Sequence, residues 1–128
     1  MVSRVQNNGL ANITSAWVAY TSLPKYLQWG TGTGAAASAN VVTTTTTTEA
    51  RATGTASQVT TTQTNDTYQV VGTITAAGTR AITEVGVFDA AGSGSPPTGG
   101  NMGIYGDFSV INLSTGDAIA FTVKVAFT

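Results

Sequence analysis

The 128-residue sequence contains no cysteine and no histidine, and only 9% of its residues are charged. The absence of cysteine excludes disulfide bonds, thiolate nucleophiles and thiolate metal sites. Without histidine, a cation site would need clustered oxygen ligands, and no calcium-loop pattern is present. We therefore expect a protein without a cofactor or a metal ion, stabilised by packing and backbone hydrogen bonds.

Basic patches and long apolar runs are also missing from the sequence. The formal net charge is -1, whereas nucleic acids and anionic membrane surfaces require a basic footprint. No stretch approaches 18 apolar residues, and the N-terminus lacks the unbroken apolar segment of a signal peptide. The sequence therefore predicts a soluble chain with no nucleic-acid partner, no membrane partner and no secretion signal.

The sequence is rich in two-residue alternation of apolar and polar side chains, which is typical of half-buried strands. Residues 118–127 alternate strictly, and residues 67–75 repeat the pattern after a turn. Residues 81–88 are apolar on both faces, as in a central strand. Further strands are expected around residues 26–29, 52–62 and 102–108, with a long exposed loop at 89–101 where glycine, serine and proline gather.

No segment of ten residues shows the period of an amphipathic helix, so the predicted fold is all-β. Short strands separated by turn signals favour an antiparallel β-sandwich, which we expect over residues 24–128. Residues 1–23 are richer in asparagine and serine. We interpret them as an extended N-terminal arm with at most one short strand, near residues 16–20, that reaches beyond its own sandwich.

Six consecutive threonines occupy residues 43–48. Threonine is β-branched and favours extended backbone. A mucin-like stalk would need abundant proline, and an ice-binding face would need a solenoid repeat, neither of which the sequence contains. We therefore predict an exposed, extended edge segment that leads into the strand at 52–62.

Candidate groups for catalysis are few. Glu84 and Asp107 are the best candidates for the acid pair of a glycosidase. Arg51 and Arg80 offer ion-pair partners, and a strand carboxylate paired with arginine usually has a structural role. The segment WGTGTG, residues 29–34, lacks the Lys-Ser/Thr of a phosphate loop and predicts a tight turn. The aromatic residues are expected in the core rather than on a sugar-binding platform, and no enzymatic activity is expected.

Three segments carry a more specific pattern: PKYLQWGTGTG at 24–34, TNDTYQVVGTITAAGTRAITEVGVFDA at 64–90 and FSVINLSTGDAIAFTVKVAF at 108–127. In this order they resemble a widespread group of small structural proteins of tailed bacteriophages. In that group a GTGT turn precedes an Ala/Thr stretch, an ITEvGvF strand is central, and a GD turn precedes the last strand. The resemblance implies a jelly-roll-like β-sandwich in the virion, most similar to capsid decoration, or cement, proteins. The resemblance also implies a homo-oligomer, and it favours a trimer.

The resemblance leads us to expect a protein of the capsid surface that binds the major capsid protein and stabilises the shell. The expected contact residues lie in the N-terminal arm: Arg4, Leu10, Ile13, Trp17 and Tyr20. The alternative is a tail-fibre or receptor-binding module, in which the threonine tract and residues 91–101 face a host glycan. An acid-dependent glycosidase that uses Glu84 and Asp107 is the third hypothesis.

Overall fold

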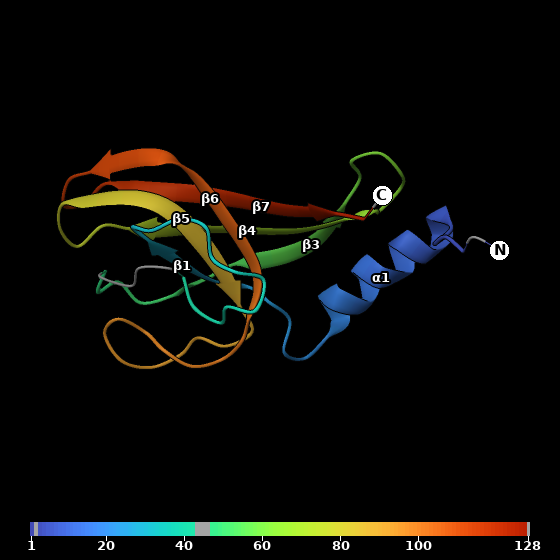
Figure 1. The fold of residues 1–128 in the computed structure, drawn as a ribbon, viewed down its shortest axis with the longest axis horizontal. Coiled ribbons are helices and arrows are strands. Elements are labelled where there is room, and N and C mark those ends of the chain that lie inside the picture. Colours follow the sequence, from blue (N-terminus) through green and yellow to red (C-terminus); the bar gives the residue numbers. More distant parts are fainter. Residues whose placement is uncertain (2, 43–46, 128) are drawn as a thin grey trace.

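The computed structural model describes residues 1, 3–42 and 47–127, which form two antiparallel sheets packed face to face and one helix (Figure 1). The elements are α1 (Asn7–Ala19), β1 (Tyr26–Gly30), β2 (Ala52–Thr53), β3 (Thr55–Val59), β4 (Thr67–Thr75), β5 (Arg80–Phe88), β6 (Met102–Leu113) and β7 (Ala118–Ala126). Sheet A has the order β2-β1-β5-β6, and sheet B has the order β3-β4-β7. The predicted all-β antiparallel sandwich is confirmed. A jelly roll has about eight strands, whereas the described residues form seven. The jelly-roll form therefore stays a prediction.

Alternating side chains fill the space between the two sheets. Trp29 of sheet A packs against Phe121 of sheet B with 6.5 Å between ring centroids, and such ring pairs add to the stabilisation from buried area. The buried core consists of Leu27, Trp29, Tyr68, Val70, Ile74, Ala76, Ile82, Val85, Val87, Leu113 and Phe121. The strands predicted at 67–75, 81–88 and 118–127 are confirmed to within one residue at each end.

The central strand β5 is buried on both faces, as its sequence predicts. Val85 and Val87 point into the core between the sheets, whereas Glu84 lies on the opposite face and is also fully buried. Two connecting segments, residues 31–42 and 89–101, contact that outer face through hydrogen bonds to Glu84 and to a β1 side chain (Figure 1). Loops therefore form a third layer over sheet A.

The two flanks of the sandwich differ. On one flank the chain passes from sheet A to sheet B at a single residue, Gly54, between the ends of β2 and β3. The N–H of Gly54 donates to the carbonyl oxygen of Lys25 at 2.7 Å, which holds this crossing against β1. On the other flank β6 and β7 are joined by a turn at 114–117 but belong to different sheets, and a groove of about 330 Å³ opens between them. The sandwich is therefore closed on one side and open on the other.

The prediction of one strand over residues 52–62 is wrong in its extent. The segment is divided at Gly54, and β3 ends at Val59. Residues 43–46 of the threonine tract lie outside the described residues. Of the remaining two threonines, Thr48 is exposed but Thr47 is buried, and neither belongs to a strand. The predicted exposed position is therefore wrong for Thr47.

The prediction of an extended N-terminal arm is wrong in conformation, because α1 replaces it and no strand forms at residues 16–20. Leu10, Thr14 and Trp17 occupy positions i, i+4 and i+7 of this helix and so share one face. That face lies on sheet B, where Trp17 packs edge-on against Tyr68 with 4.8 Å between ring centroids. Polar Thr14 interrupts the apolar stripe, so the sequence pattern alone did not indicate a helix.

Buried hydrogen bonds dock α1 on the sandwich. The hydroxyl of Thr14 donates to the carbonyl oxygen of Asn65 at 2.6 Å and accepts from the side-chain amide of Gln58 at 2.7 Å. Asp66 orders the loop that presents this carbonyl, because its buried carboxylate accepts backbone N–H groups of residues 61–63 at 2.7 to 3.0 Å. These hydrogen bonds, chiefly the one from residue 63, outweigh burial and hold the pKa of Asp66 well below its ordinary value of 3.8.

The depressed pKa of Asp66 predicts a loss of stability in acid. Because the pKa is lower in the folded chain than in the unfolded chain, the carboxylate stabilises the fold above about pH 4, and this contribution is lost as the pH falls below that value. Asp66→Asn should therefore lower the melting temperature at pH 7, and its difference from wild type should shrink toward about pH 2. Thermal unfolding followed by circular dichroism from pH 7 to about pH 2 measures this.

The matched control for this prediction is Asp117→Asn. The Asp117 carboxylate is exposed and accepts one backbone N–H, that of Ser114, at 2.8 Å. We expect a smaller effect of this change at every pH. A difference between Asp66→Asn and wild type that stays constant with pH would contradict the role assigned to the Asp66 carboxylate.

Candidate functional site

The two carboxylates considered for acid chemistry, Glu84 and Asp107, lie directly opposite each other on β5 and β6. Glu84 accepts hydrogen bonds from the backbone N–H of Gly32 at 3.1 Å and from the hydroxyl of Tyr105 at 2.8 Å. Asp107 accepts the N–H of Gly34 at 2.9 Å. The pair therefore holds the glycine-dense segment after β1 against sheet A, which is a structural role for both carboxylates.

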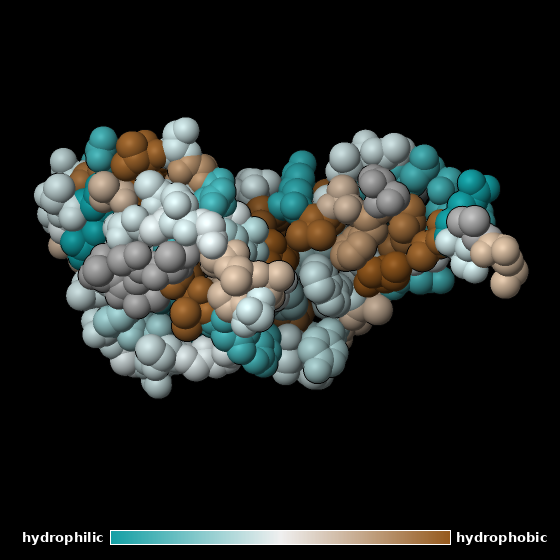
Figure 2. Space-filling view, in the orientation of Figure 1, coloured by the Kyte–Doolittle hydropathy of each residue, from teal (hydrophilic) through white to brown (hydrophobic). Residues whose placement is uncertain are grey.

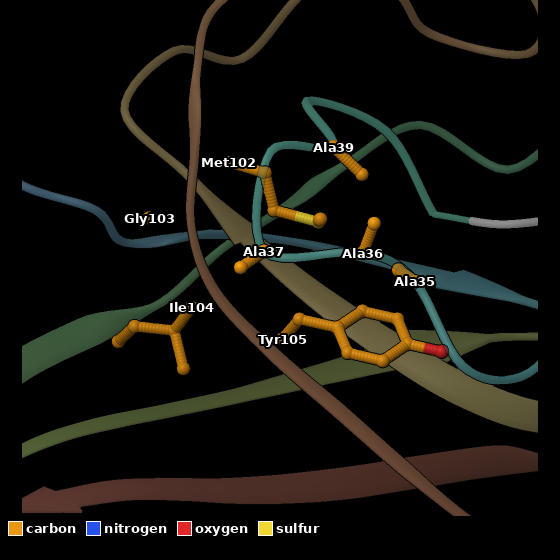
Figure 3. A pocket seen from close by; sticks show the side chains of 8 residues that line it. All are labelled: Ala35, Ala36, Ala37, Ala39, Met102, Gly103, Ile104 and Tyr105. Atoms are coloured by element: carbon orange, nitrogen blue, oxygen red, sulfur yellow. The ribbon is translucent and has the colours of Figure 1, made fainter.

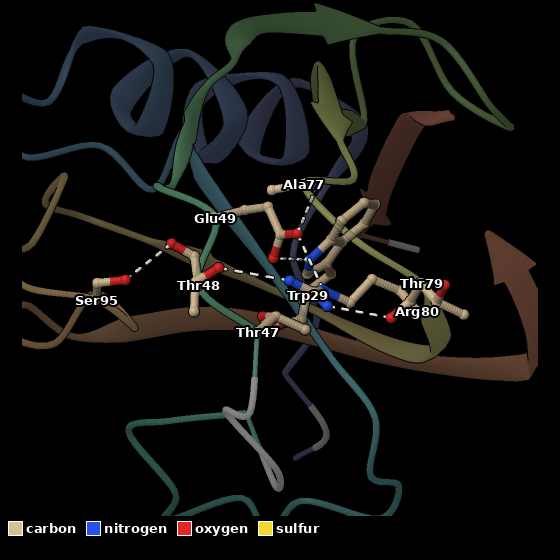
Figure 4. A network of polar contacts seen from close by, with 8 residues as sticks. All are labelled: Trp29, Thr47, Thr48, Glu49, Ala77, Thr79, Arg80 and Ser95. Carbon is tan, nitrogen blue, oxygen red and sulfur yellow. Dashed lines mark hydrogen bonds and ion pairs between the residues drawn. The ribbon is translucent and has the colours of Figure 1, made fainter. Parts of the chain in front are cut away.

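The predicted ion pairs between these carboxylates and the arginines are wrong, because Arg80 pairs with Glu49 at 3.0 Å between Nε and Oε1 (Figure 4). Glu49 also accepts the N–H of Ala77 at 2.9 Å and the indole N–H of Trp29 at 3.3 Å. Burial raises the pKa of Glu49, but these hydrogen bonds and the charge of Arg80 outweigh it, and the pKa lies below its ordinary value of 4.5. This network fixes the segment after the threonine tract to the end of the sandwich.

Arg51, the other candidate partner, supports the exposed loop at 89–101. Its guanidinium is buried and lies 3.6 Å from the centroid of the Phe88 ring. It donates hydrogen bonds to the carbonyl oxygens of Ala90 and Gly99 at 2.9 and 2.7 Å. Burial lowers the pKa of Arg51. The long loop predicted from composition is confirmed, and a buried cation holds its two ends together.

A small pocket of about 310 Å³ opens on the outer face of sheet A, between β6 and the alanine-rich segment that follows the GTGT turn (Figure 3). It is lined by Ala35, Ala36, Ala37, Ala39, Met102, Gly103, Ile104 and Tyr105. Its walls are mainly short apolar side chains, and the Tyr105 hydroxyl is directed to Glu84. The pocket offers van der Waals contacts rather than acid–base groups.

The five residues predicted to contact a partner do not share one surface. Leu10 is buried, and Trp17 packs against Tyr68 and the C-terminal Phe127, so both residues dock the helix. Tyr20 is 59% exposed, immediately beyond the C-terminal end of α1. The remaining two residues, Arg4 before α1 and Ile13 at its middle, border one groove together with the buried Leu10.

This groove has a volume of about 540 Å³ and lies beside the N-terminal half of α1. We name it the docking groove. It is lined by Arg4, Val5, Leu10, Ile13 and Phe127. Val5 is 55% exposed and Ile13 is 38% exposed. Figure 2 shows apolar side chains gathered over the end of the molecule that carries α1, at the right of the view. Sequence reasoning missed Val5 and Phe127, because their proximity depends on how the helix lies on sheet B.

Among residues 1, 3–42 and 47–127, no cluster of three or more potential ligands is close enough to hold a metal ion. The described helix is too short and too polar to cross a membrane. Comparison of the chain with protein families, with curated proteins and with solved structures found no match.

Proposed function

We propose that this protein is a structural component of a tailed-phage virion, a capsid decoration protein that binds the major capsid protein and stabilises the shell without enzymatic activity. The order of three segments that resemble small phage structural proteins supports the proposal. Each of these segments has a structural role in the fold. The GTGT segment is held by Glu84 and Asp107, the ITEVGVF segment is the buried strand β5, and the GD turn joins the two sheets.

The observation that carries the proposal is the docking groove. α1 lies at one end of the sandwich and reaches beyond the sheets (Figure 1), so the groove beside it is accessible to a neighbouring surface. Val5 and Ile13 present apolar surface there, and Arg4 adds a positive charge at the rim. An apolar centre with a polar or charged rim is the usual composition of a protein–protein interface.

A decoration protein does not need high affinity at each contact. Many copies bind one shell, so modest affinities combine into a stable coat. The requirement is instead a rigid body that presents each contact in a fixed orientation. The core between the sheets, the loop layer over sheet A and the buried hydrogen bonds of Thr14 provide that rigidity.

Ile13→Asp tests the docking groove. The change places a carboxylate where an apolar contact is expected, and we expect binding to purified shells that lack this protein to weaken at least about tenfold. Co-sedimentation of the protein with the shells measures this. Val71→Asp is the matched control, because Val71 is 40% exposed, close to the 38% of Ile13, but lies on β4 in sheet B. The control should bind as wild type does.

Imaging separates this function from the alternative. An antibody against the chain should label the shells of purified particles in electron micrographs. Label confined to the tail, together with binding to a glycan array, would instead support a receptor-binding module in which the threonine tract and residues 91–101 face the host. Equal shell binding by Ile13→Asp and wild type would reject the docking groove as the contact.

A further inference from the structure

The open flank between β6 and β7 is a second surface suited to a partner. Among the described strands, β6 pairs only with β5 and β7 pairs only with β4, so each is an edge strand of its sheet. The groove between these edges is lined mainly by apolar side chains, among them Val85, Phe108, Ile111, Ile119, Phe121 and Val123. Both sheets therefore end at the same flank, with apolar side chains accessible between them.

The two edges carry few of the features that usually keep strands apart. Exposed edge strands are commonly protected by charged side chains, proline or very short length. β6 has 12 residues and β7 has nine. Asp107 is the one charged side chain of β6 and Lys124 the one charged side chain of β7, and residues 108–113 contain no charge and no proline. Val110 is 53% exposed and Ile111 is 39% exposed. The flank suits a partner that is extended and apolar.

We propose that the occupant is a second copy of this chain, related by a two-fold axis, with β6 antiparallel to β6 of the partner and β7 antiparallel to β7 of the partner. Such a contact extends both sheets at once, and it brings the two apolar grooves together. Antiparallel pairing also places the C-terminal half of β7, which carries Lys124, beside the start of the partner's β7, where the partner's Asp117 lies. Lys124 and the partner's Asp117 are oppositely charged, and when β6 pairs over its uncharged residues 108–113 the two copies of Asp107, like the two copies of Lys124, stay apart.

Sedimentation equilibrium of the full chain tests the proposal. We expect a dimer at about 100 µM that dissociates on dilution. Ile111→Lys places two charges in the joined grooves, and we expect the dissociation constant to rise at least about tenfold. Lys124→Glu should also weaken the dimer, and this effect should become smaller in about 1 M salt, which screens exposed charges.

Val71→Lys is the control for these variants. Its exposed fraction, 40%, matches the 39% of Ile111, but it lies on β4, the central strand of sheet B, and does not line the groove. Its dissociation constant should equal that of wild type, and circular dichroism should show the same strand content for all variants. A monomer at about 100 µM, a trimer, or a dimer that Ile111→Lys leaves unchanged would overturn the proposal, since a three-fold axis cannot pair identical edges antiparallel.

Discussion

Gly54→Ala is expected to lower the free energy of unfolding by about 3 kcal/mol and the melting temperature by about 10 °C. A Cβ at this position would lie 2.6 Å from Cγ1 of Val70, 2.8 Å from Cδ1 of Leu27 and 2.8 Å from the carbonyl oxygen of Lys25. That oxygen cannot withdraw without breaking its hydrogen bond to Gly54. The closed flank must therefore open to admit one methyl group.

Gly106→Ala is the control for the closed flank. A Cβ at Gly106 in β6 would have no atom within 4 Å, and we expect a change within about 0.5 kcal/mol. Urea unfolding at low protein concentration measures both variants apart from any self-association. If the two alanine variants unfold at the same urea concentration, the crowding at Gly54 does not limit how the sheets close.

Trp17→Ala is expected to cost about 2 to 3 kcal/mol and to release α1 from the sandwich. The indole packs edge-on against Tyr68 at 4.8 Å and against Phe127 at 5.7 Å between ring centroids. A 13-residue helix is marginal in water without tertiary contacts. Amide hydrogen exchange in residues 7–19 should therefore accelerate at least about tenfold while the strands stay protected.

Tyr20→Ala is the matched control for helix docking. Tyr20 lies immediately after α1, but it is 59% exposed, so its removal should change stability by no more than about 0.5 kcal/mol. Exchange in residues 7–19 should match wild type. Protection of α1 that survives Trp17→Ala would show that Leu10 and Thr14 dock the helix without the indole.

The chemistry of the candidate site was only partly visible in the sequence. The structural role expected for Glu84 and Asp107 agrees with their hydrogen bonds, but both accept a backbone N–H of the GTGT segment, and Glu84 also accepts the hydroxyl of Tyr105, where the sequence suggested arginines. A backbone donor leaves no signal in side-chain composition, so the sequence indicated arginine. Phe127 ends the alternating segment 118–127, but its contact with Trp17 of α1 needs a segment more than one hundred residues earlier in the chain.

The sequence by itself determined where the backbone is extended, because a strand imposes a period of two on its side chains and that period is local. β4 and β7 could therefore be read from the alternation of consecutive residues, and β5 from a short run that is apolar on both faces. Only the tertiary structure decided which sheet each strand joins, that the chain crosses between sheets at Gly54, and that residues 7–19 form a helix. The helix depends on Thr14 and Trp17 meeting β3, β4 and the loop before β4, and such long-range contacts have no period along the chain.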